Sequence, residues 1–197
     1  MIDFLITLPG ILMAISIHEF GHGYAAYILG DDTAKKSGRL SLSPLKHIDP
    51  MGFLMLIIAH FGWAKPVPIN SNKFKNERMG LFLVSIAGVV CNILLAILCI
   101  YLYKYEKIYI DMYALNSIIS SAVRINVGFA VFNLLPIPPL DGSKIILSIL
   151  PNKLHYYYFK YEHVGSIILV ILIITNSIGI VIYPIYNVIL NLINIIV

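Results

Sequence analysis

Long stretches without a charged side chain limit the folds that are open to this chain. Residues 79–103 and 164–197 contain no acidic or basic residue, and a helix needs about 20 predominantly apolar residues to cross a bilayer. Of the 197 residues, 59% are apolar and 12% are charged, whereas a soluble domain averages about 45–50% and about 25%. The chain is therefore expected to be neither a cytosolic enzyme nor a disordered or disulfide-linked protein, but an all-α polytopic membrane protein.

Four membrane spans are expected along the sequence. The apolar runs predict one span each at residues 4–29, 79–103 and 112–135. The last run predicts a span followed by an interfacial or buried helix within residues 164–197. The apolar run 51–62 is too short to cross and is expected to dip into the membrane and return. No internal repeat divides the sequence, so a single domain over residues 1–197 is expected.

The positive charges predict the orientation of the chain. If run 51–62 returns to its own side, eleven lysine and arginine residues of 30–78 and 143–163 share that side, against Lys104 and Lys107 opposite. The positive-inside rule then places the N-terminus outside and residues 30–78 in the cytoplasm. The basic residues form no stripe interleaved with aromatic residues, so a nucleic-acid partner is not expected.

A small β-hairpin is expected beside the membrane on the cytoplasmic side. Leucines alternate with serines in residues 38–44, which favours a short strand, and 66–70 is its candidate edge partner. Such a pair of strands could add an extended peptide as a further strand. The alternative is an ordinary surface hairpin without a binding role.

A cluster of ionisable residues interrupts the first apolar run. Residues 18–22 read HEFGH, an HExxH pattern in which His18 and His22 share one face of a helix and can reach one ion. Glu19 lies beside the pair and can polarise a metal-bound water. Ionisable side chains within a span are costly and mark functional sites, although helix–helix hydrogen bonding is the alternative.

A third ligand must come from elsewhere, because a catalytic zinc ion is held by three protein ligands. Asp141 is the strongest candidate: it ends a span within the proline-rich break PIPPLDG at 136–142, on the side to which the HEFGH helix also runs. The remaining candidates are His47, His60, His155, Glu162 and His163. Positions among interfacial tyrosines account better for His155 and His163, and local hydrogen bonds for His47 and His60.

Two asparagines in apolar runs are further candidates. Asn92 and Asn133 could steady a substrate backbone or a developing oxyanion near the metal. Hydrogen bonding between helices is the alternative for both.

Several ordered motifs resemble the site-2 protease family of intramembrane zinc metalloproteases. HEFGH at 18–22 and NLLPIPPLDG at 133–142 are similar to its two metal-binding motifs, and AGVVCN at 87–92 is similar to a Gly-x-x-x-Asn element of its third core helix. GRLSLSPLKHIDPMG at 38–52 and FGWAKPVPIN at 61–70 resemble its compact bacterial and archaeal branch, without PDZ or CBS domains.

The resemblance implies one Zn²⁺ per chain, bound by His18, His22 and Asp141, with Glu19 as the general base. It implies a multi-pass protein of the cell membrane that cleaves transmembrane proteins or peptides, with its active site toward the cytoplasmic half. Two alternatives stay open: a membrane protein that binds or transports metal without proteolysis, and an inactive protease-like scaffold. The sequence identifies neither the substrate nor the oligomeric state.

Overall fold

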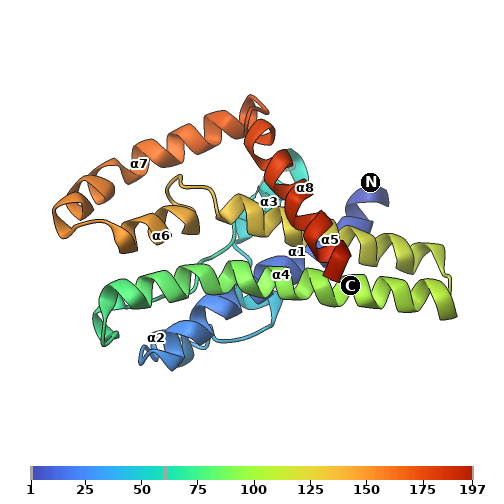
Figure 1. Cartoon of the computed structure of the whole chain (residues 1–197), viewed down its shortest axis with the longest axis horizontal. Helices are drawn as coiled ribbons and strands as arrows, with labels where there is room; N and C mark the ends of the chain where they lie inside the picture. Colours follow the sequence, from blue (N-terminus) through green and yellow to red (C-terminus); the bar gives the residue numbers. More distant parts are fainter. Residues whose placement is uncertain (1, 60–61, 197) are drawn as a thin grey trace.

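The computed structural model describes residues 2–59 and 62–196, which form helices joined by short connections (Figure 1). Two 3₁₀ turns, Pro44–Lys46 and Ser71–Lys73, lie in the connections. The α-helices are α1 (Ile2–Ile28), α2 (Thr33–Lys36), α3 (Pro50–Ala59), α4 (Glu77–Tyr109), α5 (Tyr113–Asn133), α6 (Asp141–Ile149), α7 (Asn152–Ile174) and α8 (Ile178–Ile196).

Four helices in the described part of the chain are long and apolar enough to cross a membrane, namely α1, α4, α5 and α7. The number of spans expected from the sequence is thus confirmed. The last of them begins earlier than expected, since its spanning segment is Lys153–Ile174 rather than a stretch starting at 164. The tyrosine-rich residues before 164 therefore continue the helix instead of forming a separate connection, and α8 is a shorter apolar helix.

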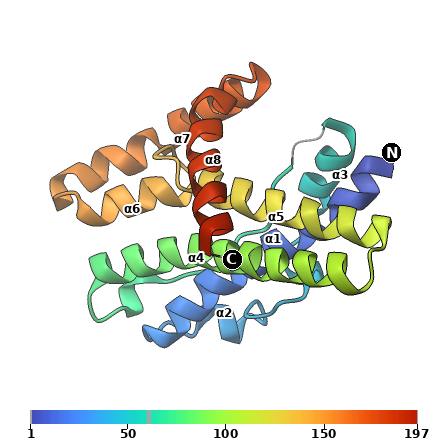
Figure 2. The same cartoon turned by 45° about the vertical axis from the view of Figure 1, so that its right-hand side comes forward.

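Helices α1, α4 and α5 pack against one another and form the centre of the molecule (Figures 1 and 2). Small side chains allow this close approach, as is usual between membrane helices. A Cβ atom added to Gly10 of α1 would lie 2.9 Å from the Ala122 backbone, and one added to Gly21 would lie 2.8 Å from Cys91 Sγ. Glycine at these two positions lets α1 lie directly against both neighbours.

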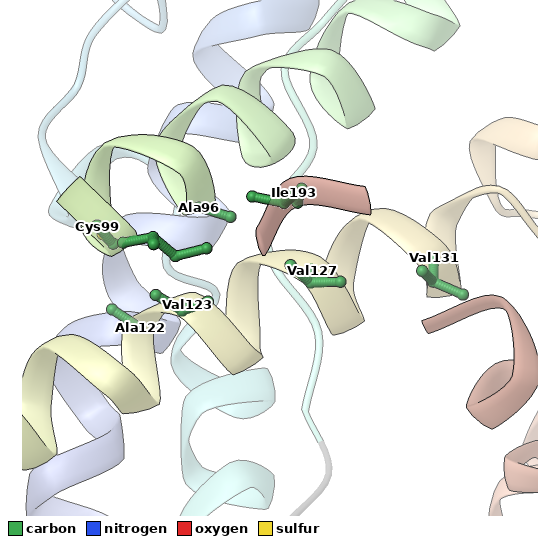
Figure 3. Packing of buried hydrophobic residues seen from close by; sticks show 8 residues of the cluster. Ala96, Cys99, Ala122, Val123, Val127, Val131 and Ile193 are labelled. Atoms are coloured by element: carbon green, nitrogen blue, oxygen red, sulfur yellow. The ribbon is translucent and has the colours of Figure 1, made fainter. Parts of the chain in front are cut away.

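The largest of the buried apolar clusters joins α4, α5 and α8, and Figure 3 shows the small and branched side chains that these helices contribute to it. Its buried members are Ala96, Cys99, Ile100, Ala122, Val123, Val127, Val131 and Ile193.

Helix α6 packs along α4 and lies between α4 and α7 in both views (Figures 1 and 2). The side chains of α7 are mostly exposed, as expected for the outer surface of a membrane protein. The chain thus places α6 against the central helices and leaves α7 on the periphery.

The predicted β-hairpin is wrong. The described residues contain no strand, and their one isolated antiparallel bridge pairs Ile48 with Ala64. Instead, the guanidinium of Arg39 donates to the carbonyl oxygens of Lys65 and Pro66, at 2.7 and 3.2 Å.

Prolines explain the absence of paired strands. Three of them, at 44, 66 and 68, lack the N–H that a ladder requires, and they outweigh the alternation in 38–44 that suggested a strand. A combined hairpin and re-entrant segment is therefore not supported, and the short run near 51–62 contains the ten-residue helix α3.

A buried carboxylate joins the end of α1 to the segment before α4. Asp31 accepts hydrogen bonds from the backbone N–H of Asn70 at 2.6 Å and of Thr33 at 3.0 Å, and from the Thr33 hydroxyl. The Lys73 ammonium lies 3.4 Å away. Burial raises the pKa of Asp31, but these hydrogen bonds outweigh it and bring the pKa below its usual value.

Replacing this carboxylate is expected to lower stability. Asp31→Asn removes the charge from three hydrogen bonds and is expected to cost about 1–3 kcal/mol of unfolding free energy. Because the pKa of Asp31 is lower in the folded state, this contribution is present above about pH 4 and is lost as the pH falls through the folded value.

Thermal unfolding in detergent, followed by circular dichroism at neutral and acid pH, measures the effect. Asp32→Asn is the matched control, because Asp32 pairs with Lys36 and Lys73 at the surface, where ion pairs contribute little. Equal unfolding temperatures for the two variants at neutral pH would contradict the prediction.

Candidate metal centre

Helix α1 places two imidazole rings side by side inside the bundle. His18 and His22 are one helical turn apart, are 3% and 7% exposed, and have their Nε2 atoms 3.0 Å from each other. Nδ1 of His22 donates to the Val84 carbonyl of α4 at 2.7 Å. Nδ1 of His18 lies 2.7 Å from Oδ1 of Asn92, also on α4. Helix α4 therefore supplies a partner to each ring on the side away from their common centre.

Asp141 approaches the same centre from the start of α6. It is 4% exposed, and its Oδ2 lies 3.0 Å from Nε2 of His18 and 3.0 Å from Nε2 of His22. The chain folds back sharply after α5 to reach this position, and a Cβ atom on Gly142 would collide with the Leu134 and Leu135 carbonyls. The prolines and glycine of PIPPLDG thus allow a carboxylate to enter the bundle beside the imidazoles.

These three side chains fit a metal ion. The Val84 carbonyl can only accept, so Nδ1 of His22 carries the hydrogen and Nε2 presents a lone pair. Oδ2 of Asp141 is buried and receives no hydrogen bond from the described residues. The donor atoms stand 3.0 Å apart, close to the roughly 3.3 Å of a tetrahedral zinc with bonds of about 2.0–2.1 Å. Such a convergence of electron pairs is stabilised by a cation.

Gly88 of α4 makes room for the two rings. A Cβ atom at this position would lie 2.7 Å from Cε1 of His22 and 2.8 Å from Cε1 of His18. The ring of Phe129, on α5, packs edge-on against His18 with centroids 5.0 Å apart. The imidazoles are thus enclosed between the bare backbone of α4 and an aromatic ring of α5.

Glu19 lies next to the ligand cluster without belonging to it. Its Oε2 accepts a hydrogen bond from the backbone N–H of Val67 at 2.8 Å. Val67 is buried and stands between two prolines, so the connection after α3 passes beside the metal centre and orients this carboxylate.

The other sequence candidates for the third ligand do not join the cluster in the described part of the chain. His47 is buried and its Nε2 bonds the Ser41 carbonyl at 2.7 Å, while Nε2 of His155 contacts the Leu150 carbonyl at 3.3 Å. The local hydrogen bond that the sequence suggested for His47 is thus present, whereas the sequence suggested an interfacial position for His155. Glu162 and His163 lie on α7, apart from the three ligands, and His60 falls outside the described residues.

The two asparagine candidates have different surroundings. Asn92 is fully buried and donates both amide hydrogens within the protein, to Ala14 at 3.0 Å and to Asn126 at 2.9 Å. Asn133 ends α5 and donates one hydrogen to the Phe129 carbonyl at 2.9 Å. The Oδ1 atom of Asn92 also lies 2.7 Å from Nδ1 of His18, so Asn92 contacts a candidate ligand directly.

An apolar cavity of about 320 Å³ lies between α1, α3, α5 and the connections on either side of α3. Its lining includes Ala14, which accepts from Asn92, and Phe129, which packs on His18, but not the three ligands themselves. Other lining side chains include Phe53 and Phe132. The cavity therefore suits an apolar side chain one residue away from the centre.

Some contacts of the centre were not anticipated from the sequence. The Val84 carbonyl and the Val67 amide are backbone groups, so no residue type signals them. Asn126 shows the same signal as Asn92 and Asn133, an amide within an apolar run, and could have been selected on that ground.

Comparison with known proteins agrees with this architecture. Residues 107–176 match the family model of Peptidase family M50. The chain is 39% identical over 183 residues to "Putative zinc metalloprotease YwhC" of Bacillus subtilis, which covers 90% of this chain and 84% of that relative. It is 31% identical over 186 residues to "Putative zinc metalloprotease Rip2" of Mycolicibacterium smegmatis, covering 89% and 69%. No solved structure matches.

The chain therefore belongs to Peptidase family M50, the site-2 protease family of metalloproteases. Its four apolar helices and this membership together indicate a multi-pass membrane protein.

A side chain at position 88 is expected to disrupt metal binding. In Gly88→Ala, the new methyl group would meet both imidazole rings and displace them from their common centre. We expect zinc affinity to fall by about tenfold or more, as for losses of support around metal-binding histidines. Competition with a chromophoric chelator measures the affinity of the purified protein.

Gly128→Ala is the matched control, because a Cβ atom at Gly128 of α5 has no neighbour within 4 Å. Both variants are checked for helix content by circular dichroism. Wild-type zinc affinity in Gly88→Ala would show that the rings do not depend on this space.

Proposed function

We propose that this protein is an intramembrane zinc endopeptidase, formed by a single domain over residues 1–197, that hydrolyses peptide bonds in or near transmembrane segments of other membrane proteins. One observation carries the proposal. His18, His22 and Asp141 converge to 3.0 Å with Glu19 beside them, inside a bundle of helices able to span a membrane.

The three ligands would hold one zinc ion and leave a coordination position for water. Bound zinc supplies an acidified water and polarises the carbonyl of the scissile peptide bond. Glu19 accepts the proton of that water and passes it to the leaving amine. The Val67 amide holds one oxygen of the Glu19 carboxylate at 2.8 Å, which limits the orientations open to the base.

The cavity beside the centre supports an apolar substrate. Its walls come from α1, α3, α5 and the connections on either side of α3, and the space would take an apolar side chain of a segment whose scissile bond lies at the centre. A transmembrane segment supplies such side chains, but its helical amides are closed to attack until it unwinds locally. The second amide hydrogen of Asn133 is the group that we assign to the substrate backbone.

The charge distribution supports an active site in the cytoplasmic half of the membrane. Most lysines and arginines lie in 30–78 and 143–163, which favours a cytoplasmic location for both segments and an external N-terminus. His22 is near the cytoplasmic end of α1 in this orientation, and Asp141 follows α5 as it returns to the same side.

Loss of the base is expected to separate zinc binding from cleavage. In Glu19→Gln the amide cannot accept the proton of the metal-bound water, so cleavage is expected to fall by about 10²–10⁴-fold. Zinc content is expected to stay at one ion per chain, because Glu19 is not among the three ligands. Cleavage of a panel of model transmembrane peptides by purified protein, with zinc measured by mass spectrometry, tests both expectations.

Glu77→Gln is the control, since Glu77 is an exposed residue at the start of α4. A strong chelator should abolish cleavage by the wild type, and added zinc should restore it. Unchanged cleavage by Glu19→Gln would overturn the proposal. Zinc binding without cleavage of any peptide by the wild type would favour a metal-binding protein or an inactive scaffold.

A further inference from the structure

We propose that Asn126 is a positioning residue for the metal centre: acting through Asn92, it determines which ring nitrogen of His18 carries the hydrogen. Asn126 lies on α5 and is completely buried. Its partners in the structure are Ala122 and Asn92. The inference rests on the proposed zinc site, but it concerns a residue outside the ligand set.

The orientation of the Asn126 amide is set by its own helix. Nδ2 of Asn126 donates to the carbonyl oxygen of Ala122 at 2.9 Å, and a carbonyl oxygen can only accept. The NH₂ group must therefore face Ala122, and Oδ1 must face away from it. In that direction lies Asn92, whose Nδ2 is 2.9 Å from Oδ1 of Asn126.

The same reasoning fixes the orientation of the Asn92 amide. Its Nδ2 faces two acceptors, Oδ1 of Asn126 and the carbonyl oxygen of Ala14 on α1 at 3.0 Å. Both amide hydrogens are thus used, and only Oδ1 is left to face Nδ1 of His18, 2.7 Å away. Because this oxygen can only accept, the hydrogen of His18 must be on Nδ1.

The consequence for the metal centre is direct. With its hydrogen on Nδ1, His18 presents the Nε2 lone pair to the point where Nε2 of His22 and Oδ2 of Asp141 also converge. The hydrogen of His22 is held on Nδ1 directly by the Val84 carbonyl. The hydrogen of His18 is held on Nδ1 by the Asn92 amide, whose orientation in turn depends on Asn126. If Asn92 turned over, its NH₂ would face Nδ1 of His18, and the hydrogen would move to Nε2, where the metal binds.

Without Asn126, a single acceptor, the Ala14 carbonyl, would hold Asn92 in its present orientation. Groups that hydrogen-bond the outer ring nitrogen of a metal-binding histidine affect metal affinity by about 10–100-fold. Asn126 acts one step further out, so we expect its loss to weaken zinc binding by about three- to tenfold. The purely structural alternative is that Asn126 only joins α4 to α5.

Nitrogen-15 NMR of histidine rings separates the two roles. The full chain, labelled in histidine and held zinc-free in detergent at about pH 8, is expected to show a hydrogen on Nδ1 of His18, whatever the state of Nε2, which lies 3.0 Å from the Asp141 carboxylate. In Asn126→Leu, which is similar in size but has no polar group, a second population of His18 without a hydrogen on Nδ1 is expected, and the zinc dissociation constant from chelator competition should rise about three- to tenfold.

One variant serves as the comparison. Ser121→Ala removes another buried polar side chain of α5 that has no part in the network. It should leave both readouts unchanged. If Asn126→Leu does not fold, Asn126→Ser replaces it, because a serine hydroxyl can bond its own helix without reaching Asn92.

The outcomes are distinguishable. A wild-type His18 without a hydrogen on Nδ1 would overturn the inference without any variant. So would an Asn126→Leu or Asn126→Ser protein that keeps the wild-type tautomer and zinc affinity. Equal losses in Asn126→Leu and Ser121→Ala would assign Asn126 a structural role only. If the wild type binds no zinc, the proposed function fails, while the tautomer of the zinc-free protein still tests Asn126.

Discussion

Polar groups inside a membrane must find their partners within the protein, and this constraint organises the whole structure. The two imidazoles of α1 are stable in the bundle because α4 offers them the Val84 carbonyl and the Asn92 amide. Those contacts require α1 and α4 to lie almost backbone to backbone, which Gly21 and Gly88 allow. The packing of the central helices and the geometry of the metal centre therefore have a common cause.

The remaining parts of the centre come from segments that are not spanning helices. Asp141 enters from a proline-rich turn that folds back after α5, and the Glu19 carboxylate is held by the amide of Val67 in the connection after α3. Irregular backbone is tolerated near a membrane when it is enclosed by protein. Here it brings a ligand and an orienting N–H to a site that three straight helices could not complete.

Much of this arrangement follows from local features of the sequence. Long apolar runs located α4 and α5, the four-residue spacing placed His18 and His22 on one face, and the break before Asp141 marked the carboxylate that joins them. The hairpin prediction is wrong because the prolines of 66–70 lack the N–H groups of a ladder, although residues 38–44 alternate as a strand would. The partners of Asn92 depend on how α1, α4 and α5 are placed around it, and no local pattern records that.

The separation of the ligands along the chain has a consequence for biosynthesis. His18 and His22 leave the ribosome early, while Asp141 follows only after α4 and α5 have been made. A nascent chain at intermediate length holds two imidazoles and the Glu19 carboxylate but lacks Asp141, so the three-residue cluster forms late in translation. Under the proposed function, a site assembled in this order cannot cleave neighbouring nascent helices while the same translocon inserts them.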